Sequence, residues 1–420
     1  MTAYRSTMHM RNPLDEPSTS TISSISTART GSTGSTGNAF SAFAQEVFGH
    51  LPRQDQRRWA ETYLKGLLGT PGRKSVRRMA SAVSAAPTAS QSLHQFISAS
   101  PWPWDPARRA LAHWAGQRAA VRAWTLAPIV APKRGLHSVG VHRRYDAAAG
   151  RVINCQVGIG MHLSTCCGDL PVDWRLHLPE TWCADPELRQ RARIPDSGDP
   201  RPLWELGLEM VDALAAQSAG PPPPVVADGR ELTDAVALAN GLSTRCLKFL
   251  VSVPGQLPLH AGPHPGGRHP HRLAGPARMH APRSPRALWT LSGPVYLPGA
   301  HHTLRLLAKW HPARTRPVRI WMTNLVHAGL DELLPLVGTQ AGTRAAMQSL
   351  REDFGLLDFE GRSFPGWHRH TTLVSAAYGW HRLSQAPGHA PACQPTAPAI
   401  SVPPSRSRAL ACGVAMPGSR

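Results

Sequence analysis

The chain has 420 residues, of which 41% are hydrophobic, and it carries a formal net charge of +20. This length can bury one large core or two smaller ones. No apolar run approaches the roughly 18 residues that a membrane-spanning helix needs, which argues against a membrane partner. The seven cysteines form no CxxC pair, so the sequence predicts neither a zinc site nor a disulfide framework and favours a cytoplasmic location.

The positive charge comes overwhelmingly from arginine, because lysine occurs only at positions 65, 74, 133, 248 and 309. Guanidinium groups bind phosphates in a bidentate manner, so an arginine-rich basic chain favours a nucleic-acid partner. A GC-rich coding bias, which raises the frequency of Arg, Ala, Pro and Gly everywhere, would give the same composition without any such partner.

Residues 1–38 are rich in Ser, Thr and Gly, and we expect them to be disordered. The region 40–122 reads as helical, with amphipathic runs at 53–68, 73–83 and 90–98 and a further helix at 105–122 that is N-capped by Asp105. A basic second helix is typical of small DNA-binding modules, and an ordinary packing domain with a solvated basic face is equally compatible. The candidate DNA contacts in this region are Arg53, Arg57, Arg73, Lys74, Arg77 and Arg78.

The region 123–383 is predicted to be a second domain that opens with three strands. They are expected at 123–130, 137–145 and 152–163, with the Gly-containing connection 146–150 as a hairpin turn. Lys133, Arg143 and Arg144 are further candidate DNA contacts here. A sheet of this kind places side chains of its central strand under a site.

Asp228 is the most informative carboxylate of the chain. It ends the short buried strand 224–228, which is followed by a helix at 232–241 and a strand at 246–253. This is a βαβ pattern, and open α/β sheets bind ligands at the carboxyl ends of their strands. Upstream, the sequence predicts a strand from 170 and helices at 185–193 and 203–217.

The segment 255–286 changes character, because it is rich in His, Pro, Gly and Arg and has almost no apolar residues. We interpret it as a low-complexity insertion, and its histidines lack any regular ligand spacing. Strands are then expected at 288–296, 304–310 and 319–325, and helices at 330–337, 343–354 and 371–383. The tail 384–420 is rich in Pro and Ala and is expected to be disordered.

Several blocks resemble DDE transposases of the insertion sequence 701 family, in the order that the family has them. The strongest is P-K-R-G-L-H-S-V-G-V-H-R-R-Y-D-A-A-A-G-R-V-I-N-C-Q-V-G-I-G at 132–160. The others are R-Q-D-Q-R-R-W-A-E-T-Y-L-K-G-L-L at 53–68, R-K-S at 73–75, S-P-W at 100–102, R-L-H-L-P-E-T-W at 175–182, V-V-A-D at 225–228 and F-E-G-R-S-F-P-G-W-H-R-H-T-T-L-V at 359–374.

The resemblance implies an α+β fold, with a ribonuclease H-like mixed sheet and flanking helices behind a helical, DNA-binding N-terminal region. It also implies three carboxylates that hold two Mg²⁺ ions for cleavage and transfer of DNA strands, since Mg²⁺ takes oxygen ligands. The implied partner is DNA carrying terminal inverted repeats. The resemblance also implies that this chain is nucleoid-associated and could form a homo-oligomer on the DNA.

The chain departs from this family pattern at two of the three acids. Asp228 in V-V-A-D matches the second acid and is the candidate catalytic and metal-binding residue. The first acid is expected where the chain has Ala127 and Pro128, and Arg344 occupies the approximate place of the third. Glu360 is a weaker catalytic candidate, and its alternative role is structural.

Three functions therefore compete on the sequence alone. The chain could be an active transposase, a catalytically dead relative that binds DNA or regulates, or a pseudogene product that folds poorly. One carboxylate cannot hold two magnesium ions, so we expect catalysis to be impaired or lost. No G-x-S-x-G elbow and no G-x-x-x-x-G-K-[ST] loop occurs, which disfavours serine-hydrolase and nucleotide-driven chemistry.

Overall fold

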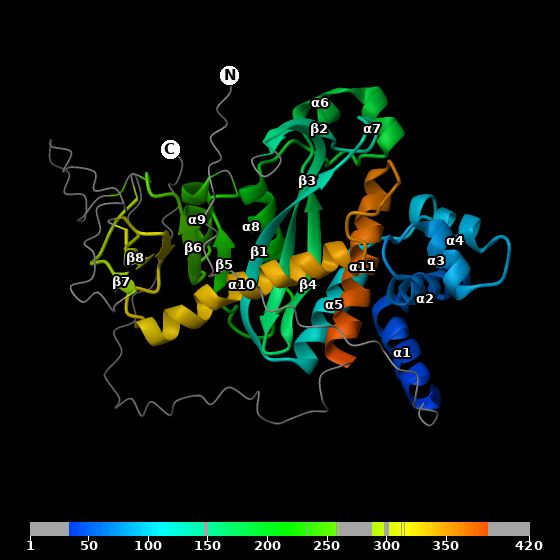
Figure 1. Cartoon of the computed structure of the whole chain (residues 1–420), viewed down its shortest axis with the longest axis horizontal. Helices are drawn as coiled ribbons and strands as arrows, with labels where there is room; N and C mark the ends of the chain where they lie inside the picture. The colour runs from blue at the N-terminus through cyan, green and yellow to red at the C-terminus, as the bar shows by residue number, and fades with distance from the viewer. Residues whose placement is uncertain are drawn as a thin grey trace, which may run out of the picture.

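The computed structural model describes residues 33–146, 150–232, 234–257, 259, 288–297, 302–311, 313–314 and 316–384 (Figure 1). Helix α1 (Thr33–Phe48) begins inside the stretch 1–38 for which we expected no structure. The rest of that stretch, nearly all of the segment 255–286 and the tail from 385 lie outside the described residues.

The N-terminal region is helical, as expected. Its helices are α1, α2 (Gln54–Gly69), α3 (Val76–Val83), α4 (Ala89–Ser98) and α5 (Asp105–Arg118). Ser75 caps α3, because its side chain accepts a hydrogen bond from the backbone N–H of Arg78. The prediction that Asp105 caps α5 is wrong: Trp104 takes the cap position, and Asp105 is the first helical residue. An acidic residue in the first turn still favours a helix, because it faces the positive end of the helix dipole.

The first strands of the second region form an antiparallel group centred on one long strand. Its members are β1 (Val121–Pro132), β2 (His142–Asp146), β3 (Arg151–Thr165) and β4 (Gly168–Leu176). The long strand β3 pairs with β1 along one edge, and with β2 and β4 in succession along the other. The strand expected at 137–145 is therefore shorter than predicted, since it begins only at His142.

Parallel pairing then extends the sheet from β1. Strands β5 (Val225–Asp228) and β6 (Phe249–Val253) run parallel to β1, which gives the order β4–β3–β1–β5–β6. The strands β9 (Arg319–Thr323), β8 (Arg305–Lys309) and β7 (Trp289–Leu291) continue the sheet antiparallel beyond β6. Three antiparallel strands followed by two parallel ones in this order form a ribonuclease H-like sheet, which confirms the fold class that the sequence resemblance implied.

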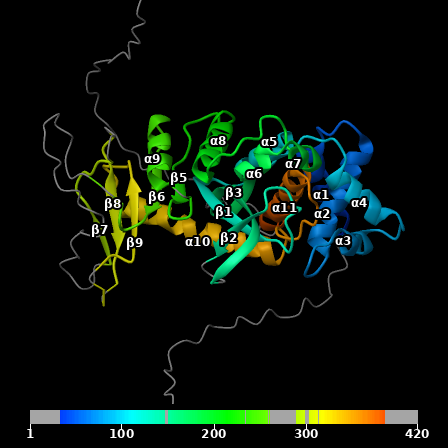
Figure 2. The same cartoon turned by 90° about the horizontal axis from the view of Figure 1, so that it is seen from above.

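Helices cover both faces of the sheet (Figure 2). The helices α8 (Leu203–Ala215) and α9 (Ala235–Thr244) lie on one face, and α10 (Leu330–Glu352) crosses the other over β1 and β5. The helix α11 (Phe364–Ser384) packs between the sheet and the N-terminal helices, and the short helices α6 (Glu180–Ala184) and α7 (Pro186–Ala192) follow β4. No helix in the described ranges has the length and hydropathy of a membrane span.

The helix α10 is longer than the sequence predicted. The two helices expected at 330–337 and 343–354 are one helix, and Pro335 lies inside it. Gly342 explains part of the difference, because a Cβ atom there would lie only 3.2 Å from the carboxylate of Asp169 at the start of β4. The glycine that weakens the helix in isolation is thus what allows α10 to pack against this strand.

Successive side chains of β5 point to opposite faces of the sheet and belong to two different hydrophobic clusters. Val225 and Ala227 belong to the large cluster that includes α8 and α9, whereas Val226 belongs to a smaller cluster under α10. Successive strand residues point to opposite faces, so Asp228 follows Val226 onto the α10 side. The sheet therefore directs this carboxylate toward α10.

Candidate functional site

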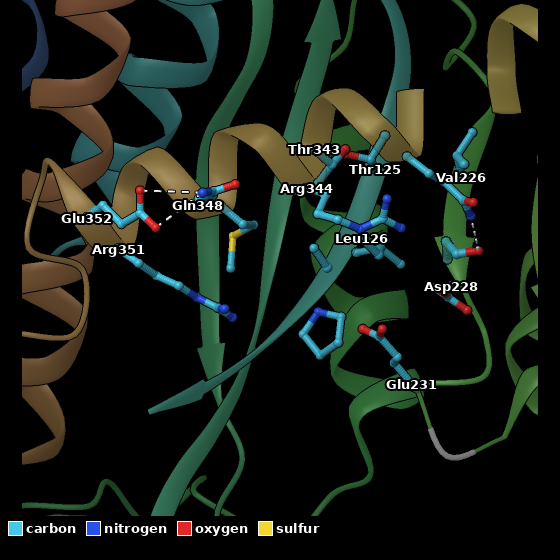
Figure 3. A pocket seen from close by; sticks show the side chains of 15 residues that line it. Thr125, Leu126, Val226, Asp228, Glu231, Thr343, Arg344, Gln348, Arg351 and Glu352 are labelled. Carbon is cyan, nitrogen blue, oxygen red and sulfur yellow. Dashed lines mark hydrogen bonds between the residues drawn. The ribbon is translucent and has the colours of Figure 1, made fainter. Parts of the chain in front are cut away.

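A pocket of about 380 Å³ lies where β1, β5 and α10 meet (Figure 3). Its described lining comes from four segments and mixes polar, apolar and charged side chains. The lining residues are Thr125, Leu126, Ala127, Pro128, Val226, Ala227, Asp228, Glu231, Gln340, Thr343, Arg344, Met347, Gln348, Arg351 and Glu352. The pocket lies at the carboxyl end of β5, beside the middle of β1, and the carboxyl ends of parallel strands are where α/β sheets bind ligands.

Buried polar contacts join α10 to the floor of this pocket. The hydroxyl groups of Thr125 on β1 and Thr343 on α10 lie 2.7 Å apart. Thr343 also donates to the carboxylate of Asp169 at 2.5 Å. Because these groups are buried and paired, they hold one face of α10 in a fixed register over β1.

Asp228 is held by three neighbours rather than facing the pocket as a bare carboxylate. Arg230 donates from Nε to Oδ1 at 3.0 Å and from Nη2 to Oδ2 at 2.8 Å. Ser252 on β6 donates to Oδ1 at 2.5 Å. Arg319 on β9 donates to Oδ2 as well, so two guanidinium groups and one hydroxyl occupy both carboxylate oxygens.

These neighbours set the charge state of Asp228. Burial by itself would raise the pKa of the carboxyl group, but hydrogen bonds from Arg230 and Ser252 and the charges of Arg319 and Arg230 outweigh it and lower the pKa to about 2. The carboxylate is therefore ionised at neutral pH, and its charge is balanced by arginine.

The positions expected for the other two acids lie in the same pocket. Leu126 and Ala227 are paired in the parallel register of β1 and β5, so Ala127 is the next residue of β1 beside Asp228. Pro128 follows it, and Arg344 reaches into the pocket from α10 on the side of Asp228 and Glu231 (Figure 3). The geometry thus brings together the positions that the family resemblance named, but two of them carry an alanine or proline and an arginine.

The pocket does not fit a pair of magnesium ions. Two other carboxylates line it, Glu231 and Glu352, and Glu352 accepts a hydrogen bond from Gln348. Across the described ranges no three His, Cys, Asp or Glu side chains gather closely enough to hold a metal ion. A carboxylate already bonded to two guanidinium groups is a poor ligand, because a cation would have to displace or repel them.

Glu360 lies outside this pocket, at a junction between the N-terminal helices and the loop that joins α10 to α11. Its carboxylate accepts a hydrogen bond from Arg73 at 2.6 Å, and both side chains are exposed. In the same loop, Asp358 accepts a bond from the backbone N–H of Lys74 at 2.7 Å. Glu360 therefore joins the loop after α10 to the N-terminal region through its contact with Arg73.

Besides Arg73, two further candidate DNA contacts take part in the same junction. Lys74 is buried with 5% of its surface exposed, and its ammonium group donates to the carbonyl oxygen of Thr70. Lys133 is half-buried and donates to the carbonyl oxygen of Phe359 at 3.0 Å. Burial lowers the pKa of both lysines. The packing of the loop against the start of α3 encloses Lys74, which disfavours the direct DNA contact that the sequence predicted for it.

The remaining candidate DNA contacts lie in two separate places. Arg53, Arg77 and Arg78 are exposed and Arg57 is half-buried on the N-terminal helices, where Arg53 pairs with Asp55 and Arg78 donates to the carbonyl oxygen of Pro71. Arg143 and Arg144 are exposed on β2, near the end of the hairpin that β2 and β3 form. The structure does not bring these two groups into one cluster.

Sequence reasoning missed the residues that hold Asp228. Arg230 follows it by two positions in the turn after β5, which is a local signal that the sequence does contain. Ser252 and Arg319 reach it only because β6 lies next to β5 and β9 lies next to β6. That pairing is not visible in the spacing of the residues.

Comparison with known proteins identifies the family of this chain. Residues 46–317 match the family model of the DDE superfamily endonuclease, which covers more than half of the chain. Among solved structures, the chain is similar to the piggyBac transposase in its synaptic complex with hairpin DNA, with a TM-score of 0.42 and 11% identity over 82% of this chain and 71% of the other. A search of curated proteins finds no match. The chain belongs to the DDE superfamily endonuclease family.

Proposed function

We propose that this protein is a transposase of the insertion sequence 701 type that binds DNA and no longer cleaves it. The observation that carries the proposal is the state of Asp228, whose two carboxylate oxygens are bonded to Arg230, Ser252 and Arg319. The implied target is DNA with terminal inverted repeats, bound in the nucleoid, where the protein could act as a homo-oligomer.

The loss of cleavage follows from the chemistry of strand transfer. Two Mg²⁺ ions activate the attacking oxygen and stabilise the leaving oxygen at a phosphodiester, and they need several carboxylates in one place. Ala127 and Pro128 offer no side-chain ligand, and Arg344 brings a positive charge to the position of the third acid. Asp228 alone cannot replace them, because its charge is already balanced by arginine.

DNA binding is supported by a basic surface on the β2–β3 hairpin. A surface pocket of about 780 Å³ there is lined by Pro132, Lys133, Arg134, Leu136, Arg143, Arg151, Val152, Ile153 and Asn154. Four of these described residues are basic and none is acidic. A two-stranded ribbon fits a DNA groove, and its arginine side chains can reach the phosphates on either side.

The test is a strand-cleavage assay with the purified full chain. Plasmid DNA carrying candidate terminal inverted repeats is incubated with protein and Mg²⁺ or Mn²⁺, and Asp228→Ala is assayed in parallel. We expect no nicking above background from either protein. Robust nicking by the wild-type chain that disappears in Asp228→Ala would overturn the loss of catalysis.

A salt titration of DNA affinity tests the binding half of the proposal. Phosphate contacts release counterions, so the logarithm of the affinity should fall steeply and linearly with the logarithm of the salt concentration. Affinity without any salt dependence, or an unfolded protein by circular dichroism, would instead support a pseudogene product.

A further inference from the structure

Positive charge exceeds negative charge around Asp228. Three arginine side chains lie near it: Arg230 and Arg319 are bonded to its oxygens, and the Arg344 charge is close enough to lower the pKa of Arg319 after the larger effect of burial. The two carboxylates of Asp228 and Glu231 cannot balance three guanidinium groups. The region therefore carries excess positive charge even though it occupies the place where family members hold cations.

Arg344 is the member of this cluster that remains available to a ligand. Within the described ranges it makes no hydrogen bond or ion pair, and its side chain is exposed in the pocket (Figure 3). Arg351 lies seven residues further along α10, on the same face of the helix, and also lines the pocket. Two guanidinium groups thus enter one pocket from a single helix.

The floor of the pocket supplies a rigid frame for these groups. Thr343, directly before Arg344, is fixed by its bonds to Thr125 and Asp169. Gln340, one turn earlier, donates to the carbonyl oxygen of Ala227 and accepts from Trp321 at 3.0 Å each. The backbone of α10 beside Arg344 is therefore held at both β1 and β5, so an anion that binds there loses little affinity to ordering of the helix.

We propose that this pocket binds a backbone phosphate of DNA without a metal ion, with Arg344 as the main phosphate ligand and Arg351 as the second. Guanidinium groups suit a phosphodiester, because their planar N–H groups match its oxygens in a bidentate geometry. Arg230 and Arg319 balance the charge of Asp228, and together with Arg344 and Arg351 they outnumber the carboxylates of the pocket, which are those of Asp228, Glu231 and Glu352. This inference rests on the proposed function, because it assumes that the chain binds DNA.

The first experiment measures affinity of the full chain for a fluorescein-labelled DNA duplex by fluorescence anisotropy. Binding is compared in Mg²⁺ and in EDTA at matched ionic strength, for the wild type, Arg344→Ala and the control Arg191→Ala. Arg191 is an exposed arginine on α7, outside the lining of the pocket. We expect equal wild-type affinity in both buffers, a loss of about tenfold in Arg344→Ala because one charged hydrogen-bonding group is removed, and little change in Arg191→Ala.

The second experiment locates the contact. Phenylglyoxal modifies accessible arginine side chains, and peptide mass mapping reports which ones the DNA protects in EDTA. We expect protection of Arg344 and Arg351 and none of Arg191.

The outcomes separate this inference from the function on which it rests. DNA binding that is unchanged in Arg344→Ala, with Arg344 still modified in the complex, would overturn the phosphate site and leave DNA binding standing. Affinity that requires Mg²⁺ would overturn the metal-free site. No DNA binding by the wild-type chain in either buffer would overturn both.

Discussion

The guanidinium group of Arg319 on β9 donates a hydrogen bond to Oδ2 of Asp228 on β5, across the intervening strand β6. This contact joins the ribonuclease H-like part of the sheet to the antiparallel strands added beyond it. It turns the acid that best matches a catalytic carboxylate into one partner of an ion-pair cluster. The stability of the fold should therefore depend on the charge of Asp228.

We predict that Asp228→Asn lowers the free energy of unfolding by about 2 kcal/mol at neutral pH. The substitution removes the charge that balances Arg230 and Arg319 and leaves the half-buried Arg319 without its anion. Urea denaturation measures the change. A metal-binding acid cluster behaves in the opposite way, because removing one of several like charges relieves repulsion; an unchanged or increased stability would therefore argue against the cluster.

Asp212 supplies a matched control for that measurement. It pairs with Arg245 at 2.6 Å, and about half of its side chain is exposed. Surface ion pairs contribute little, so Asp212→Asn should change stability by less than about 1 kcal/mol.

Arg108 should be a main structural residue of the junction between α5, β4 and α11. It is 4% exposed, pairs with Asp173 at 2.8 Å, and donates to the Trp174 carbonyl and to Thr372. Removing a buried cation leaves its acceptors unpaired, so Arg108→Ala should cost about 3 kcal/mol or more in urea denaturation. Arg109→Ala, at the exposed neighbouring position, should cost little; equal effects of the two would contradict this role.

The pH dependence of stability should reflect His370. The ring is buried between Tyr63 and the carbonyl oxygen of Gly355, with both hydrogen bonds at 3.0 Å, and burial lowers its pKa to about 4. Because the folded state resists protonation, its contribution is complete above pH 6.5 and is lost as the pH falls toward 4, by up to about 3 kcal/mol.

The variant His370→Gln tests that assignment by urea denaturation over this pH range. It should be less stable than the wild type at pH 7 and show a shallower decline toward pH 4. A decline as steep as that of the wild type would assign the pH dependence to other groups, among which His162 and His368 are also buried with lowered pKa values.

The basic candidates should divide into structural and DNA-binding residues. Lys74→Ala should lower stability, because it opens the junction with the loop after α10, without changing the salt dependence of DNA affinity. The double variant Arg143→Ala/Arg144→Ala should leave stability nearly unchanged and lower the salt slope by about 2, since each phosphate contact contributes about 1. Fluorescence anisotropy over a salt series distinguishes them, and the reverse assignment would refute the division.

Local patterns of the sequence predicted most helices and strands of the fold. The amphipathic helix at 53–68 and the strand ending at Asp228 are found within two residues of their predicted bounds. The predictions were wrong where tertiary contacts outweigh local preference. The helix α10 continues through Gly338 and Gly342 because it packs on β1, β4 and β5, and Trp104 rather than Asp105 caps α5.

The candidate site was predictable only in part, for the same reason. Asp228, Ala127 and Arg344 could be placed from the motif order, and the structure brings them to one pocket. The partners of Asp228 could not, since Arg319 lies 91 residues away and meets it through the order of the strands. Lys74 was named as a DNA contact from its charge, and its burial was not predictable because charge in a sequence does not reveal burial.

Arginine, rather than a metal ion, balances the charge of Asp228. Isothermal titration calorimetry of the full chain with Mg²⁺ and with Mn²⁺ tests it most directly, with Asp228→Asn alongside and a chelator titrated in the same buffer as the positive control. We expect no saturable binding of either ion up to millimolar concentration by the wild type or the variant. Saturable binding by the wild type that is lost in Asp228→Asn would contradict it.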